Sequence, residues 1–163
     1  MKSVQAIPNK IFTIDTLQAQ LKRWRLQNKK IVFTNGVFDI LHEGHIASLS
    51  EAALQGNILI VGVNADASVK KLKGQSRPVN NENSRALLLA SLLMTDAVII
   101  FNEDTPFNLI TAIMPDVLVK GGDYTIETIV GAKEVIANGG QVIITPILKG
   151  FSTTSIIERM KKE

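Results

Sequence analysis

One stretch in the first third of the chain constrains the fold most. The apolar run Ile31–Phe33 leads into the polar, glycine-containing segment 34–45, and a helical pattern follows directly. Such turns are common phosphate sites in α/β proteins, because the free N–H groups and the positive dipole end of the helix point at the turn. The segment also holds both histidines of the protein, three residues apart. The stretch therefore predicts an α/β fold with an anion-binding turn.

Helical and strand patterns alternate along the rest of the chain. Strands are expected at 31–34, 57–64, 96–101, 116–120 and 141–146, with helices at 13–27, 46–55, 66–72, 82–94, 105–114, 130–138 and 152–161. This alternation predicts one Rossmann-like α/β domain, with a doubly wound, parallel, five-stranded sheet and helices on both faces. We expect residues 1–12 to form a flexible lead-in and residues 13–163 to form the domain.

Composition excludes several classes of function. The 163 residues include no cysteine, which excludes disulfides and thiolate zinc sites. The net charge of +3 is modest, and the basic residues form no stripe with interleaved aromatics, so we expect no nucleic-acid partner. The longest apolar runs are too short to cross a bilayer, and Met1–Gln5 does not begin a signal peptide. We therefore expect a cytoplasmic protein that does not associate with membranes.

Polar or glycine-bearing segments follow four of the expected strands, at 35–45, 64–73, 120–124 and 149–155. The carboxyl ends of parallel strands meet at one edge of the sheet, where doubly wound folds bind their ligands. These four segments are therefore expected to form one site.

The residues of the turn carry a family resemblance. Gly36–His45 fits the pattern G-x-F-D-x-x-H-x-G-H and resembles the signature of the cytidylyltransferase-like nucleotidyltransferases. Gly150–Thr154 resembles the second motif of that family, at the start of the last helix. Leu148 and Lys149 stand where the family usually has an Arg-Thr pair, so no arginine is carried over there.

Further segments resemble the heptose 1-phosphate adenylyltransferase domain. They are Asn64–Gly74, Arg77–Val79, Asp104–Pro106 and Pro115–Tyr124. The resemblance implies transfer of AMP from ATP to a small-molecule sugar phosphate, D-glycero-D-manno-heptose 1-phosphate, with Mg²⁺ on the phosphates. The products would be ADP-heptose, used for lipopolysaccharide, and pyrophosphate. A separate kinase is expected to supply the sugar phosphate, and a homodimer or higher homo-oligomer is expected because relatives commonly associate.

His42 and His45 are the strongest candidate catalytic residues. Their spacing puts them on the same side of the first helical turn. The resemblance implies that they hydrogen-bond the triphosphate as donors. The alternatives are a metal pair or buried structural histidines, and two histidines alone are too few for a zinc site. No protein metal site is therefore expected.

Other residues of the turn have smaller expected roles. Gly36 allows the backbone close to the nucleotide, or simply ends the strand, and Gly44 leaves space between the histidines. Phe38 is a candidate nucleotide-binding residue, although packing under the turn is its favoured role. Asp39 is expected to accept hydrogen bonds from the backbone N–H groups of the turn. Asn35 fits either a structural or a nucleotide-binding role.

Basic residues supply the expected charge neutralisation. Lys73 is expected to be catalytic, and Lys71, Arg77 and Arg85 are expected to bind the substrate phosphate, with a solvated basic face as the alternative for the lysines. Lys120, Gly121 and Asp123 follow a strand at the ligand edge and are expected to bind the nucleotide. Ser152, Thr153 and Thr154 offer hydroxyls and N–H groups to the nucleotide at a helix N-terminus, and they also cap that helix.

The predicted reaction is in-line attack of the sugar phosphate on the α-phosphorus of ATP. Three rivals remain open from the sequence. They are a related cytidylyltransferase acting on glycerol 3-phosphate, a non-catalytic nucleotide-binding module, and a flavodoxin-like electron carrier.

Overall fold

The computed structural model describes residues 6–146, 148 and 150–160. Its strands are β1 (Ile11–Phe12), β2 (Ile31–Gly36), β3 (Ile58–Asn64), β4 (Ala97–Phe101), β5 (Val117–Gly121) and β6 (Gln141–Thr145). Its α-helices are α1 (Ile14–Leu26), α2 (Glu43–Ala53), α3 (Asp66–Lys73), α4 (Glu82–Ala90), α5 (Phe107–Ile113), α6 (Ala132–Ala137) and α7 (Thr153–Met160). Short 3₁₀ helices form at Pro8–Lys10 and Ile126–Thr128.

The sheet is parallel throughout, in the order β1-β4-β3-β2-β5-β6. The parallel α/β architecture predicted from the sequence is therefore confirmed, but the predicted count of five strands is wrong. The sixth strand, β1, comes from the segment expected to be a lead-in, and it pairs Ile11 with Val98 and Phe12 with Ile99 of β4. Residues 1–5 of that lead-in lie outside the described residues.

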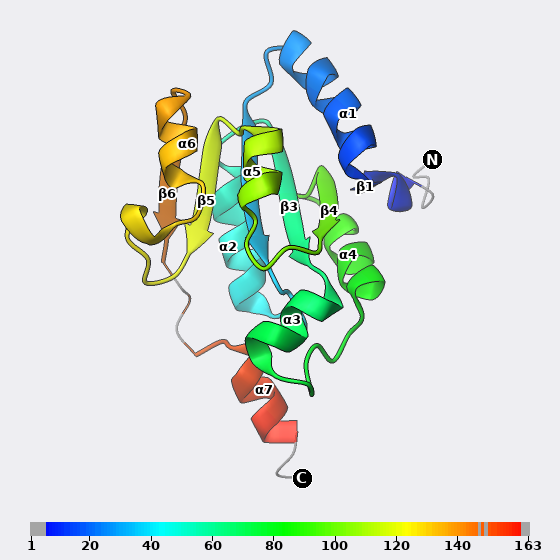
Figure 1. The fold of residues 1–163 in the computed structure, drawn as a ribbon. Helices are drawn as coiled ribbons and strands as arrows, with labels where there is room; N and C mark the ends of the chain where they lie inside the picture. Colours follow the sequence, from blue (N-terminus) through cyan, green and yellow to red (C-terminus); the bar gives the residue numbers. More distant parts are fainter. Residues whose placement is uncertain (1–5, 147, 149, 161–163) are drawn as a thin grey trace.

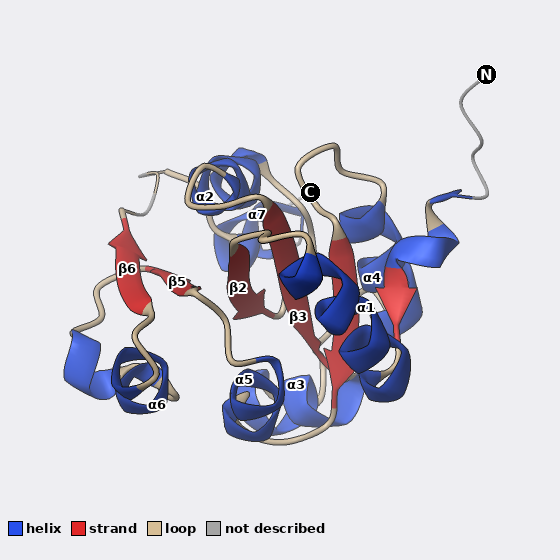
Figure 2. Cartoon of the chain, turned by 90° about the horizontal axis from the view of Figure 1, so that it is seen from above, coloured by secondary structure: helices blue, strands red, loops and turns tan. Residues whose placement is uncertain are grey.

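Two apolar cores lie on opposite faces of the sheet. Ile31 and Phe33 of β2 pack into the core that α1, α5 and α6 cover. Val32, between them, packs into the second core with α2 and α4. Successive side chains of a strand point to opposite faces, so one apolar strand serves both cores. Figure 2 shows α2 on one side of the sheet and α5 and α6 on the other.

The strand order reverses at β2, which lies between β3 and β5. This is the switch point where doubly wound sheets open a crevice beyond the strand ends. Figure 1 shows α3 and α7 at that end of the sheet, where the arrows of β2 and β5 point. The fold therefore places the turn 37–42 at the head of the crevice. Within the described ranges, no helix is both long and apolar enough to span a membrane.

Candidate active site

The turn between β2 and α2 brings the two histidines into contact. His42 is the N-cap residue of α2, and its carbonyl oxygen accepts hydrogen bonds from the N–H groups of His45 and Ile46. The two imidazole rings stack, with 3.8 Å between their centroids and 18° between their planes. Phe38 packs edge-on against His45 at 5.3 Å between centroids.

Partial burial favours the neutral form of both histidines. It lowers the pKa of His45 to about 4, with a further contribution from the neighbouring His42. Burial also lowers the pKa of His42 below its ordinary value. The Nδ1 atoms of both rings are buried and bond to no atom of the described residues. A neutral imidazole carries one N–H and one free lone pair, so the pair can bind ligand oxygens as donors without taking up a proton.

Phe38 fixes the approach to the turn from β2. Its φ is +50°, an uncommon backbone conformation for a residue with a large side chain. A side-chain carbon at Gly36 would lie 3.0 Å from the Phe38 ring, so a larger residue there would push the ring by a few tenths of an ångström. Phe38 thus packs under the turn, as the sequence predicts, and Gly36 does more than end the strand.

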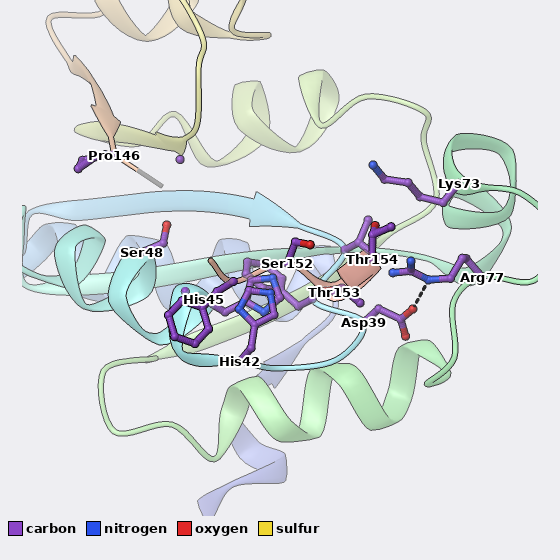
Figure 3. A pocket seen from close by; sticks show the side chains of 15 residues that line it. Asp39, His42, His45, Ser48, Lys73, Arg77, Pro146, Ser152, Thr153 and Thr154 are labelled. Atoms are coloured by element: carbon purple, nitrogen blue, oxygen red, sulfur yellow. Dashed lines mark hydrogen bonds and ion pairs between the residues drawn. The ribbon is translucent and has the colours of Figure 1, made fainter. Parts of the chain in front are cut away.

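The histidines line a first cavity of about 340 Å³ (Figure 3). The other residues that line it are Val37, Phe38, Asp39, Gly44, Ser48, Lys73, Arg77, Gly121, Pro146, Phe151, Ser152, Thr153 and Thr154. The last three stand at the start of α7, where the Ser152 hydroxyl accepts a hydrogen bond from the N–H of Ser155. Two helix N-termini, those of α2 and α7, therefore face one cavity, which favours an anionic ligand.

A second cavity, of about 410 Å³, opens on the other side of the end of β2. Polar side chains that line it are Asn35, Asn64, Lys73, Asp104, Thr105, Lys120, Tyr124 and Thr128. The two cavities share Val37 and Lys73. A smaller cavity of about 200 Å³ is lined by both His45 and Lys120. The site is thus a pair of adjoining cavities on either side of one strand end.

Of the three charged residues that line the second cavity, Lys73 and Asp104 are exposed and Lys120 is the most buried. It is half-buried, and its ammonium donates a hydrogen bond to Asn35 Oδ1 at 3.2 Å and lies 5.5 Å from the centroid of the Tyr124 ring. Burial lowers its pKa. Within the described part of the chain it makes no ion pair. A desolvated cation without an anion is costly, which favours an anionic ligand next to it.

Asp39 joins the turn to the loop between α3 and α4. Its carboxylate accepts hydrogen bonds from Arg77 Nε at 2.6 Å and from the N–H groups of Val79 and Asn80. Burial by itself would raise the pKa of Asp39, but these three donors outweigh it and lower the pKa below its usual value. The sequence analysis expected Asp39 to accept hydrogen bonds from N–H groups of its own turn. Its carboxylate instead accepts them from Val79 and Asn80, about forty residues away in sequence.

Arg85 does not reach either cavity. Its side chain is fully buried on α4, and its guanidinium donates hydrogen bonds to Val37 O, Asn80 O and Asp66 Oδ1. The substrate phosphate role expected of Arg85 finds no support in this position. An arginine on an otherwise apolar helix needs an anion, and the sequence alone does not show which one. The sequence analysis therefore assigned a ligand phosphate to Arg85, whereas the structure supplies the carboxylate of Asp66.

Two further candidates line neither the first nor the second cavity. Lys71 is two-thirds exposed and pairs with the exposed carboxylate of Asp104 at 2.9 Å. Asp123 is exposed and lines none of the three cavities described above. Neither position supports the expected ligand contact. The remaining candidates do line the two cavities. The first cavity is lined by Gly44, Gly121 and Ser152–Thr154, the second by Asn35, Gly36 and Lys120, and both by Lys73.

The sequence reading missed Ser48 and Pro146, which line the first cavity. Ser48 follows His45 by three residues on α2, so helical spacing places it on the same face of the helix. That signal was available in the sequence. Pro146 follows β6 directly, and its position depends on how far that strand extends.

Metal-binding groups are sparse in the described residues. No set of three or more His, Cys, Asp or Glu side chains there is arranged to hold a metal ion. Asp39 is the one carboxylate, within the described ranges, that lines the first cavity, and both of its oxygens already accept hydrogen bonds. These residues do not fit a metal ion held by the protein.

Comparison with known proteins places these features in a family. A family model described as cytidylyltransferase-like matches residues 33–159. The chain is 48% identical to the bifunctional protein HldE of Rhodospirillum rubrum over 159 residues, which covers 98% of this chain and 32% of the relative. It is 53% identical to that of Hyphomonas neptunium over 149 residues, with 91% and 31% covered. The chain spans about a third of the length of these curated relatives.

Two solved structures share the fold. The crystal structure of a lipopolysaccharide core biosynthesis protein from Thermoplasma volcanium is 32% identical, with a TM-score of 0.60, and covers 76% of this chain and 99% of its own. Pantoate-beta-alanine ligase from Francisella tularensis is 16% identical with a TM-score of 0.60, covering 93% of this chain and 76% of its own, and shares the fold alone. The signature turn, the two adjoining cavities and these similarities agree: the chain belongs to the cytidylyltransferase-like family.

Proposed function

We propose that this chain transfers AMP from ATP to the phosphate of D-glycero-D-manno-heptose 1-phosphate, giving ADP-heptose and pyrophosphate. One observation carries the nucleotidyl transfer. The stacked rings of His42 and His45 share a cavity with the N-termini of α2 and α7. A triphosphate fits that combination of donors, because it presents many anionic oxygens to fixed N–H groups.

The acceptor belongs in the second cavity. Lys120 there lacks an anion partner among the described residues, and a sugar phosphate supplies one. Asn35, Asn64 and Tyr124 line the same cavity and offer hydrogen bonds to sugar hydroxyls. Lys73 lines both cavities, so its ammonium lies where the acceptor phosphate meets the nucleotide. The sequence analysis expected Lys120 to bind the nucleotide, whereas this proposal assigns it to the acceptor phosphate.

The chemistry needs positioning and charge neutralisation. An oxygen of the acceptor phosphate attacks the α-phosphorus in line, the bond from that phosphorus to the bridging oxygen breaks, and the electron pair leaves with pyrophosphate. The acceptor is already anionic, so no general base is required. Lys73, Arg77 and the two histidines stabilise the charge that develops. Mg²⁺ enters as the counterion of ATP and belongs to the substrate.

The choice of heptose and adenine rests on sequence. Asn64–Gly74 and Pro115–Tyr124 resemble the heptose 1-phosphate adenylyltransferase domain, and both segments border the second cavity. The similar Thermoplasma protein is described as a lipopolysaccharide core biosynthesis protein, which supports a sugar phosphate acceptor.

Pyrophosphate release tests the proposal. ATP and CTP are each paired with heptose 1-phosphate and with glycerol 3-phosphate. We expect release with ATP and heptose 1-phosphate alone. Release with CTP and glycerol 3-phosphate alone would identify the related cytidylyltransferase, and ATP binding without release from any pair would identify a non-catalytic module.

A further inference from the structure

The buried guanidinium of Arg85 makes three hydrogen bonds to other residues of the protein. Its Nη1 donates to Val37 O at 2.6 Å, its Nε to Asn80 O at 3.0 Å, and its Nη2 to Asp66 Oδ1 at 2.7 Å. The side chain has no exposed surface. Three segments therefore meet on one side chain: the turn after β2, the loop before α4 and the first residue of α3.

A continuous set of hydrogen bonds leads from Arg85 to the first cavity. Asn80, whose carbonyl accepts from Arg85, donates its backbone N–H to Asp39 Oδ1 at 2.9 Å and its side-chain amide to Asp39 O at 2.7 Å. Asp39 Oδ2 in turn accepts from Arg77 Nε at 2.6 Å. Arg77 lines the cavity, and Figure 3 shows its side chain beside Asp39.

Arg77 is held by one end. Its Nε is bound to Asp39, whereas its two terminal nitrogens make no hydrogen bond to any described residue. A guanidinium fixed at Nε presents its remaining donors in one direction, which suits bidentate binding of a phosphate.

We propose that Arg85 is a positioning residue that acts through Asn80 and Asp39 to fix the guanidinium of Arg77 in the first cavity. The ligand of Arg77, the ATP phosphates, rests on the proposed function, whereas the coupling between the two arginines does not. Arg85 supports the reaction without touching a substrate. A lysine cannot replace it, because a single ammonium cannot match three acceptors that lie around a planar fork.

A double-mutant cycle on kcat/KM for ATP tests this coupling. We expect Arg85→Lys and Arg77→Gln each to lower kcat/KM about ten-fold. The double variant should lie within about two-fold of Arg77→Gln alone, since Arg85 acts through Arg77. Losses that multiply would overturn the proposal, because they would mean that Arg85 acts independently. Arg23→Lys, on the exposed face of α1, is the control and should match the wild type.

A second variant, Asn80→Ala, tests the proposal even if Arg85→Lys does not fold. This variant keeps both backbone hydrogen bonds of Asn80 and the Arg85–Asp66 ion pair, and removes only the bond to Asp39 O. Circular dichroism establishes the fold of each variant. We expect a smaller loss of kcat/KM for Asn80→Ala that disappears in the Arg77→Gln background. An undiminished loss there would contradict the proposal.

Nuclear magnetic resonance of arginine Nε–H groups gives a readout without activity. The Arg77 signal, assigned by its absence in Arg77→Gln, should be protected from exchange in the wild type and lose protection in Arg85→Lys or Asn80→Ala. Unchanged protection in both variants overturns the inference, whatever the activity. If the wild type releases no pyrophosphate with any acceptor, the proposed function fails, while lost protection in the variants would still support the coupling.

Discussion

A side-chain carbon at Gly44 would lie 3.1 Å from the Cε1 and Nδ1 atoms of the His42 ring. The same carbon would lie 3.1 Å from Phe151 Cβ, so the residue is enclosed by the turn and by the start of α7. Gly44 thus permits the His42 ring to lie where it stacks on His45.

Gly44→Ala should therefore displace the His42 ring or Phe151 by a few tenths of an ångström. We expect kcat to fall about ten-fold while the melting temperature changes little, because misplaced catalytic groups cost rate more than stability. Pyrophosphate release and thermal melting are the measurements. Glu51→Ala, on the exposed side of α2, is the control and should retain full activity. Full activity in Gly44→Ala would mean that the position of His42 is not critical.

His45→Ala should lower turnover by at least about a hundred-fold, since it removes a fixed donor to the triphosphate. The ring is packed between His42 and Phe38, so a moderate loss of stability is also expected. Both quantities are measured on the same preparation. Retained turnover together with a collapsed melting temperature would assign His45 a structural role instead.

The half-buried His45 should make the protein less stable in mild acid. Its pKa is about 4 in the folded state against an ordinary value of 6.5, so between these values the unfolded chain binds a proton that the folded protein does not. The free energy of unfolding should therefore fall as the pH decreases from about 6.5 to about 4, and the full contribution is present above about 6.5. Urea titrations across this range measure it. His45→Gln should show a shallower decrease, and an equal decrease in both proteins would point to another group.

Lys120→Met should weaken acceptor binding. We expect the KM for the sugar phosphate to rise about ten-fold and the KM for ATP to stay within about two-fold, because Lys120 lines the second cavity and not the first. Lys70→Met, on the exposed side of α3, is the matched control. A rise in the KM for ATP alone would instead assign Lys120 to nucleotide binding.

The sequence predicted the turn after the central strand β2 better than it predicted the edge strand β1. Gly36–His45 was placed correctly because three signals agree there: the end of an apolar strand, a glycine-bearing turn and a helical pattern. Strand β1 was missed because two residues are too few to show alternation. It is held in place partly by Lys10, whose ammonium donates to the carbonyl oxygens of Leu92 and Thr95, more than eighty residues away.

The surroundings of individual side chains were predicted less well than the positions of the segments that carry them. Arg85 was expected at a ligand because its partner, Asp66, could not be identified without knowing that α3 begins beside α4. Asp123 was expected in the cavity, but Gly122 before it has a φ of +129°, which redirects the chain at that point. Long-range pairing and glycine conformation are both properties of the folded backbone, and local pattern does not encode them.

Lys73, on the border of two cavities, has a consequence for how substrate preference can change. On the proposed function two substrates share this one flexible ammonium, so a substitution there should alter the affinity for both at once. Residues that line a single cavity, such as Thr153 in the first or Thr128 in the second, carry no such constraint. Substitutions that change the preferred acceptor are therefore expected among the residues that line only the second cavity. A substitution of Lys73 would change the binding of both substrates.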